Sequence, residues 1–502
     1  MNIQRDENMT KEQCTDLMNI LAVLISYINK FSLSFRLIHG LVGFELMKES
    51  IHKEMKMLFD KGSMDDFLKS LKSRLKSVTS KENQKNMLTA YHMCIWLDQM
   101  LTYEEIAIER LSVYSLIPLS AFSYVEIDTL NDNYEDTGIC INPKLPIFKT
   151  AMRRNDGTEM ERTAASRDSF FRMNGELCNI SYYEWNKKYI VHNIIVPYEY
   201  NEFDGITKTE GNLKVGFIPI TDRTDIIIPD YKEAREGRYK LRKMHINAPN
   251  HEEIICSRLE QGLKLACEND VDIVFAPEML GNKQTEHCEG NYNKFVHCIY
   301  SNAALNDKRP PLLTIMPSYW RNGINSATIV YRDGHVLGRQ KKYTPYIDFQ
   351  ACSIEGIKQE QVQELYMIHI YGVHRIVISI CAEFLSGFDS EFICGKLGST
   401  LAIVPAFSHG ERDFVSKLGT LFPYGTSVVW GDCCGAVAYA PKIIGGCCLT
   451  GSNEIHKMGD NCKCSYSCEY GKSCLFTVEL PLKILYSKEK QPQYQPIQHV
   501  LS

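Results

Sequence analysis

The chain has 502 residues, of which 44% are hydrophobic and 23% are charged. These proportions are ordinary for globular proteins and exclude a collagen-like, low-complexity or wholly disordered chain. The formal net charge is −5, so the composition does not indicate nucleic-acid binding. A chain of this length predicts about three domains, or one large fold with an attached module.

The cellular compartment follows from the first residues and the cysteines. The most hydrophobic early segment, residues 20–28, is too short to cross a bilayer. The first ten residues are polar and unlike a signal peptide. Nineteen cysteines without a secretion signal favour a reducing compartment. We therefore expect a cytoplasmic protein that makes no contact with a membrane.

Residues 1–120 predict a mainly α-helical N-terminal domain. Thr10 and Gln13 have the spacing of a capping box before the periodic apolar residues of a first helix. Ser63 is placed to cap a later helix. Further helices are expected over residues 45–59, 85–101 and 103–114.

A short run of basic residues, Lys69 to Lys76, lies on the polar faces of one of these predicted helices. Acidic and basic residues are nearly balanced in this part of the chain. The run is therefore interpreted as a solvated helix face, with a phosphate- or partner-binding surface as the alternative.

Residues 121–205 are rich in turns and aromatic residues and predict a connecting region of mixed structure. From about residue 206 the pattern changes to alternating strands and helices, which favours an α/β domain over residues 206–488. A polar tail, 489–502, follows. Asp333-Gly334 predicts a hairpin turn within residues 326–339. The other elements expected are strands at 213–220, 271–276, 312–316, 376–380, 401–404, 428–439 and 475–480, and a helix at 252–268.

Three polar residues stand where predicted strands or hairpins end: Glu278, Lys342 and Cys381. Such positions collect catalytic residues in α/β sheets. A thiol near neutral pH needs a base or a positive neighbour to become a nucleophile. A buried glutamate can take its proton, and a lysine can stabilise an oxyanion, so the set predicts acyl transfer. Each residue alone is more typical of structural roles.

The three segments VDIVFAPEML, NSATIVYRDGHVLGRQKKYTP and VISICAEFL resemble, in this order, the signature of the carbon–nitrogen hydrolase (nitrilase) superfamily. The resemblance covers roughly residues 210–485. Lys342 rather than Lys341 matches the family's lysine, because Pro345 follows at the family's spacing. Cys381-Ala382-Glu383 is similar to the Cys-x-Glu form found in nitrilases.

The resemblance implies a four-layer α-β-β-α sandwich that forms a homodimer or higher oligomer and needs no cofactor. Glu278 would be the general base, Lys342 the oxyanion-binding residue and Cys381 the nucleophile. The backbone N–H of Ala382 and the side chain of Glu383 would support them. The family often has a second glutamate near the lysine, and Asp348 and Glu355 are two unassigned candidates.

Three features depart from the family pattern or extend the site. Residues 221–250 form a long charged segment, interpreted as a surface loop, a lid or an interface. Eight cysteines follow residue 430, and free thiols are favoured over a zinc site at Cys462, Cys464, Cys468 and Cys474, because the spacing is not that of common zinc sites. No bound metal is therefore expected. His409 is a candidate for the substrate pocket, with a structural role as the alternative.

The predicted function is hydrolysis of a small amide or nitrile through a thioester on Cys381. Two alternatives stay open. One is acyl transfer to an amine. The other is an effector or scaffold role with a protein partner bound through residues 1–205, for example in bacterial defence. The extra N-terminal residues favour the partner, and the intact Glu-Lys-Cys set favours an enzyme.

Overall fold

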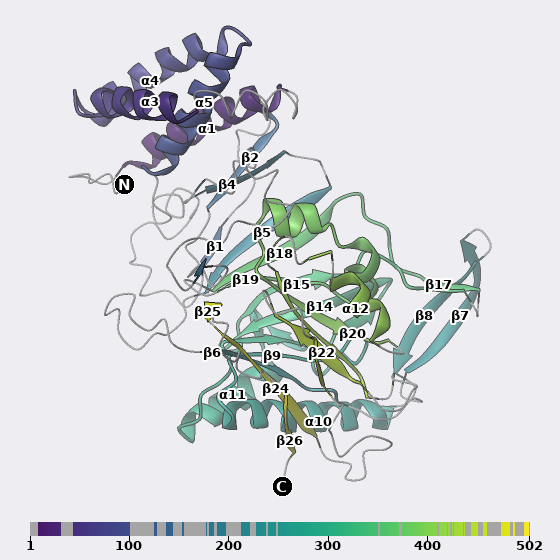
Figure 1. The fold of residues 1–502 in the computed structure, drawn as a ribbon. Coiled ribbons are helices and arrows are strands. Elements are labelled where there is room, and N and C mark those ends of the chain that lie inside the picture. The colour runs from purple at the N-terminus through teal and green to yellow at the C-terminus, as the bar shows by residue number, and fades with distance from the viewer. Residues whose placement is uncertain are drawn as a thin grey trace.

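A computed structural model gives the fold (Figure 1). It describes residues 9–31, 44–100, 125–127, 137–143, 153–154, 177, 180–184, 188–196, 212–220, 227–236, 239–246, 249–349, 352–370, 374–408, 411–418, 420–421, 424, 426–434, 436, 443–449, 455–458, 473–481, 485–486 and 496–500.

The N-terminal part of the chain is helical, as the sequence predicts. Thr10 and Gln13 form the capping box of the first helix, and Ser63 forms a second capping box with Asp66. The helix over Gln84–Asp98 has buried residues on all sides and lies in the middle of the group, so its apolar residues show only weak helical periodicity. The helices are α1 (Lys11–Asn29), α3 (Phe44–Phe59), α4 (Met64–Thr79) and α5 (Gln84–Asp98). The helix predicted over 103–114 lies outside the described residues.

The basic run on α4 is partly engaged within the helical group. Lys72 forms an ion pair with Asp16 of α1 at 2.6 Å. Arg74 forms another with Glu54 of α3 at 2.9 Å. These pairs are half-exposed and contribute little stability, but they direct the run toward neighbouring helices. The arrangement favours a solvated helix face over a phosphate-binding surface.

Two large sheets form the α/β part, and their facing sides share one hydrophobic core. The first has the order β13-β14-β12-β9-β6-β24-β26, with β15 paired to β14. Its strands are β13 (Tyr319–Arg321), β14 (Ile324–Tyr331), β12 (Leu313–Ile315), β9 (Ile273–Phe275), β6 (Asn212–Phe217), β24 (Cys474–Pro481), β26 (Ile497–Val500) and β15 (Val336–Lys341).

The second sheet has the order β1-β5-β18-β19-β20-β21-β22-β23. The pairs β19–β20 and β20–β21 are parallel, so the ends of these strands meet at one edge. The strands are β1 (Val125–Ile127), β5 (Tyr189–Val196), β18 (Gln363–Ile370), β19 (His374–Ile378), β20 (Leu401–Ala406), β21 (Ser427–Asp432), β22 (Gly445–Cys448) and β23 (Ile455–Met458).

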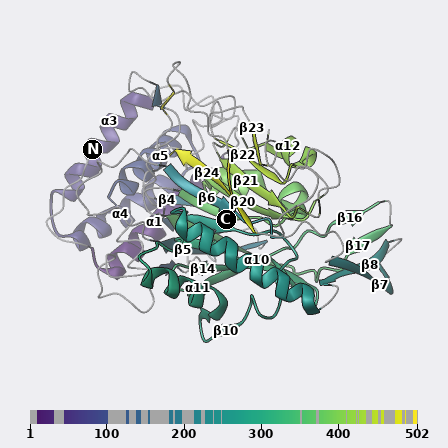
Figure 2. The ribbon, with the colours of Figure 1, turned by 90° about the horizontal axis from the view of Figure 1, so that it is seen from below.

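Helices pack against both sheets. α10 (Pro249–Glu268) and α11 (Lys294–Leu305) share a second core with the outer face of the β6–β9–β12 region, and Figure 2 shows them lying across it. α12 (Arg412–Leu418) and the π-helices η3 (Glu383–Gly387) and η4 (Glu391–Lys396) contribute Phe384, Phe392 and Phe414 to the core of the second sheet. The mixed α/β class predicted for this part of the chain is thus observed.

The described strands within residues 121–205 contact both parts of the molecule. β2 (Ile139–Pro143) and β4 (Ile180–Glu184) pair with each other and pack on the helices through Ile141 and Ile180. β5 instead pairs in parallel with β18 along its whole length. This segment therefore extends the second sheet, which the sequence did not indicate.

The interpretation of residues 221–250 as a surface loop is wrong. The segment contains the antiparallel strands β7 (Ile227–Glu236) and β8 (Tyr239–Ile246), and β8 pairs in parallel with β17 (Ser353–Glu355). With β16 (Ile347–Asp348) they form a four-stranded sheet that stands out from the rest of the fold in both views (Figures 1 and 2). Backbone pairing organises this charged segment where side-chain periodicity gives no signal.

Most other predicted strands are present, with one shortened. The Asp333-Gly334 turn joins β14 to β15, and Gly334 has a φ of +93°. The strand predicted over 428–439 ends at Asp432, because the chain turns there and the N–H of Ala436 bonds back to the carbonyl of Cys433. Among the late cysteines, Cys433, Cys447, Cys448 and Cys474 are buried, whereas Cys462, Cys464 and Cys468 lie outside the described residues. Within the described ranges, none of the helices has the length and apolar character needed to cross a membrane.

Two buried histidines predict a loss of stability in acid. His369 on β18 donates through Nε2 to Asn193 of β5 at 2.8 Å, and Nδ1 of His374 lies 2.9 Å from the hydroxyl of Thr400. Burial, with the charge of Arg375, lowers the pKa of His369 to about 3 and that of His374 to about 4. In the unfolded chain both titrate near pH 6.5.

Because these pKa values are lower in the folded state, the stability that the neutral rings provide is complete above about pH 6.5 and is lost as the pH falls toward 4. For each histidine we expect the free energy of unfolding to be roughly 2 kcal/mol lower at pH 5 than at pH 7.5. Denaturant unfolding at the two pH values measures this loss. In His374→Gln the decrease should be clearly smaller, and an unchanged decrease would contradict the assignment.

Candidate active site

Glu278 follows β9 on a loop that leads out of the first sheet. Its side chain is 1% exposed. Its backbone N–H donates to the carbonyl of Ala406, at the end of β20 in the second sheet. The next residue, Met279, has a φ of +67° and donates its N–H to the Ser318 hydroxyl. This strained turn, held from both sides, fixes the carboxylate where the two sheets meet.

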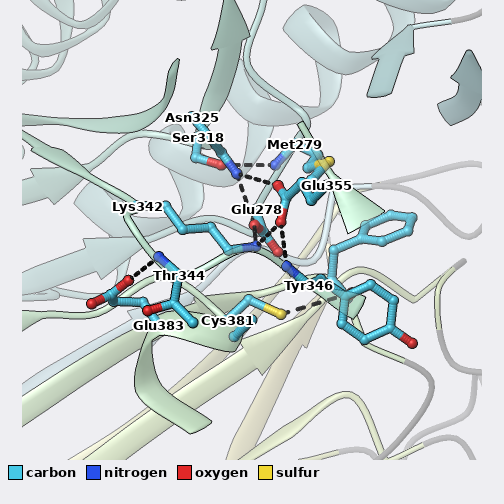
Figure 3. A network of polar contacts seen from close by, with 12 residues as sticks. Glu278, Met279, Ser318, Asn325, Lys342, Thr344, Tyr346, Glu355, Cys381 and Glu383 are labelled. Atoms are coloured by element: carbon cyan, nitrogen blue, oxygen red, sulfur yellow. Dashed lines mark hydrogen bonds and ion pairs between the residues drawn. The ribbon is translucent and has the colours of Figure 1, made fainter. Parts of the chain in front are cut away.

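Lys342 directly follows β15 and is also 1% exposed. Its Nζ lies 2.7 Å from Oε1 of Glu278 and 2.7 Å from Oε2 of Glu355 (Figure 3). The neighbouring Lys341 points elsewhere and pairs with Glu360 and Glu364 near the surface. Lys342 is thus the lysine that meets the predicted glutamate.

Glu355 and Asn325 complete the polar cluster. Glu355 ends β17, is fully buried, and also accepts the backbone N–H of Tyr346 at 3.0 Å. The amide nitrogen of Asn325, on β14, donates to Glu278 at 2.8 Å and lies 3.5 Å from Glu355. Glu355 rather than Asp348 is therefore the second carboxylate beside the lysine.

Cys381 comes from the other sheet, just after β19. It is 4% exposed and has a φ of +47°, a conformation that L-residues rarely adopt. Its N–H donates to the carbonyl of Pro405 at 2.9 Å, and its thiol lies 4.0 Å from the carbonyl of Phe407. A sharp strained turn after a buried strand presents a nucleophile in other hydrolase folds.

The charges in this cluster interact strongly. Burial raises the pKa of Glu278, and Glu355 raises it further, while Lys342 and a hydrogen bond with Cys381 act against this. Burial opposes the charge on Lys342, but Glu278, Glu355 and Cys381 outweigh it and hold the pKa of the ammonium above its usual value. Burial also raises the pKa of the Cys381 thiol, with Glu278 adding to this and Lys342 opposing it.

These shifts favour a protonated thiol and a charged lysine, and they make Glu278 a stronger base than a free carboxylate. Their elements belong to different sheets, so the folding of both is needed to assemble them (Figure 3). A thiol that interacts with a buried base and a fixed ammonium can attack an electrophilic carbon.

The two predicted supporting residues lie beside this cluster. The backbone N–H of Ala382 has no acceptor among the residues that the structure describes, as befits the residue preceding η3. The carboxylate of Glu383 accepts the N–H groups of Tyr343 at 3.0 Å and Thr344 at 2.5 Å. Glu383 thereby ties the turn after Cys381 to the segment after Lys342. His409 lies outside the described residues.

No protein-family model and no curated protein matches the sequence. Among solved structures, the chain is similar to an amidase from Nesterenkonia sp., with 13% identity, a TM-score of 0.35, and coverage of 57% of this chain and 96% of that one. A C-to-A mutant of that amidase in complex with butyramide gives 13% identity, a TM-score of 0.34, and coverage of 57% and 97%.

Glutamine-dependent NAD+ synthetase from Acinetobacter baumannii, solved in complex with ADP, gives 14% identity and a TM-score of 0.34 over 56% of this chain and 49% of that chain. Because these TM-scores are low, we base the functional proposal on the geometry of the site alone.

Proposed function

We propose that the chain is a carbon–nitrogen hydrolase that cleaves a small amide or nitrile through a thioester on Cys381. The observation that carries this proposal is the buried ammonium of Lys342, held 2.7 Å from both Glu278 and Glu355 beside the only thiol that contacts this cluster among the described residues. Burying three charges is costly unless they are paired. A cluster of this kind is typical of functional sites.

In the proposed reaction the sulfur of Cys381 attacks the amide carbon, and its proton passes to Glu278. The ammonium of Lys342 and the backbone N–H of Ala382 stabilise the negative oxygen of the tetrahedral intermediate. Glu278 then returns the proton to the leaving nitrogen, and the C–N bond breaks to give ammonia or an amine and a thioester. Water, deprotonated by Glu278, hydrolyses the thioester to a carboxylic acid and regenerates the thiol.

Glu355 and Asn325 have a supporting role in this scheme. Glu355 holds the lysine in place, and Asn325 orients the carboxylate of Glu278 by donating to it at 2.8 Å. Both act on groups that touch the substrate rather than on the substrate itself. The proposal also includes the four-layer α-β-β-α arrangement, which the shared core of the sheets and the outer helices support.

Intact-protein mass spectrometry tests the function. Wild-type protein, Cys381→Ala and the matched control Cys298→Ala are incubated with a panel of primary amides and nitriles, and ammonia release is followed in parallel. We expect an acyl adduct and ammonia with wild type and with Cys298→Ala, in which an exposed thiol on α11 is lost. The proposal fails if Cys381→Ala releases ammonia at the wild-type rate.

Acyl transfer to an amine uses the same thioester and differs only in its second step. Adding candidate amines to the acylated enzyme separates the two reactions. Hydrolysis predicts that the free acid stays the main product, whereas transfer predicts a new amide in its place.

A further inference from the structure

Asp432 is a buried acid that the proposed reaction does not use. It is the last residue of β21 and has no solvent exposure. One carboxyl oxygen, Oδ1, accepts the backbone N–H of Ser408 at 2.8 Å, and the other has no hydrogen-bond partner among the residues that the structure describes. An acid buried this completely calls for an explanation, because burial without full pairing costs stability.

The segment that Asp432 holds, residues 405–408, contacts both proposed catalytic residues. The carbonyl of Pro405 accepts the N–H of Cys381 at 2.9 Å, and the carbonyl of Ala406 accepts the N–H of Glu278 at 3.2 Å. The carbonyl of Phe407 faces the thiol of Cys381 at 4.0 Å. Three consecutive carbonyls thus hold a nucleophile from one sheet and a base from the other.

Asp432 is itself fixed from two sides. It lies opposite Ala406 in the parallel pairing of β20 and β21, and its N–H donates to the carbonyl of Ile444 at 2.7 Å. Burial raises the pKa of its carboxyl, and the charge of Glu278 adds to this, while the bond from Ser408 opposes it. Asparagine has nearly the same shape as aspartate and keeps an oxygen that can accept the N–H of Ser408, so it is a close mimic of this residue.

We propose that Asp432 is a positioning residue: by accepting the N–H of Ser408 it fixes residues 405–408, and through their carbonyls it sets Cys381 against Glu278. This inference rests on the function proposed above, because it assigns a purpose to the alignment of those two groups. A displacement of about 1 Å in such an alignment can change a rate by about a hundredfold.

The test needs no natural substrate. It measures the coupling between Glu278 and Cys381, defined as the shift that Glu278→Gln causes in the pH midpoint of Cys381 alkylation. Alkylation of Cys381 by iodoacetamide is followed against pH by peptide mass spectrometry, with the exposed Cys298 as an internal reference. Glu278→Gln should lower the pH midpoint of this reaction, because the charge of Glu278 raises the pKa of the thiol. In otherwise wild-type protein we expect a shift of about one unit, which is a tenfold change in the proton affinity of the thiol.

The same comparison is then repeated in Asp432→Leu, Asp432→Asn and, as a matched control, Glu286→Gln. Glu286 is a largely buried acid that accepts a hydrogen bond from Thr328, and none of its hydrogen bonds within the described part of the chain involves residues 405–408. We expect the coupling to fall to about twofold or less in Asp432→Leu and to persist in Asp432→Asn and Glu286→Gln.

Two results would overturn the inference. One is full coupling in a folded Asp432→Leu. The other is loss of coupling in a folded Asp432→Asn, which keeps the acceptor for Ser408; this result can be obtained even where the leucine variant does not fold. The absence of coupling in otherwise wild-type protein would instead count against the proposed Glu278–Cys381 pair, so the two failures are distinguishable.

Discussion

Replacing Lys342 by methionine is expected to abolish turnover and to lower the unfolding free energy by about 3–5 kcal/mol. The side chains have similar length, so the change removes little more than the charge. Glu278 and Glu355, each 2.7 Å from the ammonium in the wild type, would then face each other in the core without a cation. Two buried carboxylates in contact cannot both stay ionised.

The pH dependence of this variant identifies the cause. Without the lysine, repulsion and burial raise the pKa of the carboxyl pair in the folded state above its value in the unfolded chain. The folded state then binds more protons, so the deficit relative to wild type is largest at alkaline pH and shrinks as the pH falls toward 5. Denaturant unfolding of both proteins at pH 8 and pH 5 measures this trend.

Two further variants control the experiment. Lys341→Met removes the adjacent lysine, which is a quarter exposed and forms ion pairs near the surface, and should change stability by less than about 1 kcal/mol. Adding Glu355→Gln to Lys342→Met should restore part of the lost stability, because it removes one of the two repelling charges. If the decrease in unfolding free energy of Lys342→Met did not depend on pH and Glu355→Gln did not reduce it, the decrease would come from packing alone.

The sequence identifies the three residues that meet in this cluster because each ends a strand or hairpin in a short recognisable motif. Glu355 has no such signal. It reaches Lys342 because β17 pairs antiparallel with β16 on one side and in parallel with β8 on the other. β8, which belongs to the long charged segment 221–250, thus helps to position the second carboxylate, and no local sequence pattern records such a non-local pairing.

Asn325 and Asp432 illustrate two other limits. Asn325 stands within a motif, but its role depends on the position of its amide relative to two carboxylates, which spacing alone does not fix. Asp432 lies in a strand that reads as apolar, and only the register of β20 and β21 places it opposite Ala406. The pairing of β5 with β18 is equally non-local, because their first paired residues, Tyr189 and Gln363, lie 174 positions apart in the sequence (363 − 189).

Replacing Glu278 by glutamine is expected to reduce turnover by about 10²–10⁴-fold while leaving the fold intact. The amide oxygen of glutamine can still accept from Lys342 and Asn325, which donate to Oε1 of Glu278 in the wild type. What is lost is the group that takes the thiol proton and returns it to the leaving nitrogen. Ammonia release from an amide shown to acylate Cys381, at several substrate concentrations, measures the effect.

The same substitution should increase the reactivity of the Cys381 thiol toward alkylation, although it slows turnover. Because the charge of Glu278 contributes to the raised pKa of Cys381, its removal lowers that pKa and makes the thiol easier to alkylate at neutral pH. Slower turnover together with a more ionised thiol would show that Glu278 acts as a base. If Glu278 only raised the pKa of the thiol through its charge, removing that charge would speed turnover instead. Turnover in Glu278→Gln within about threefold of wild type would remove Glu278 from the reaction.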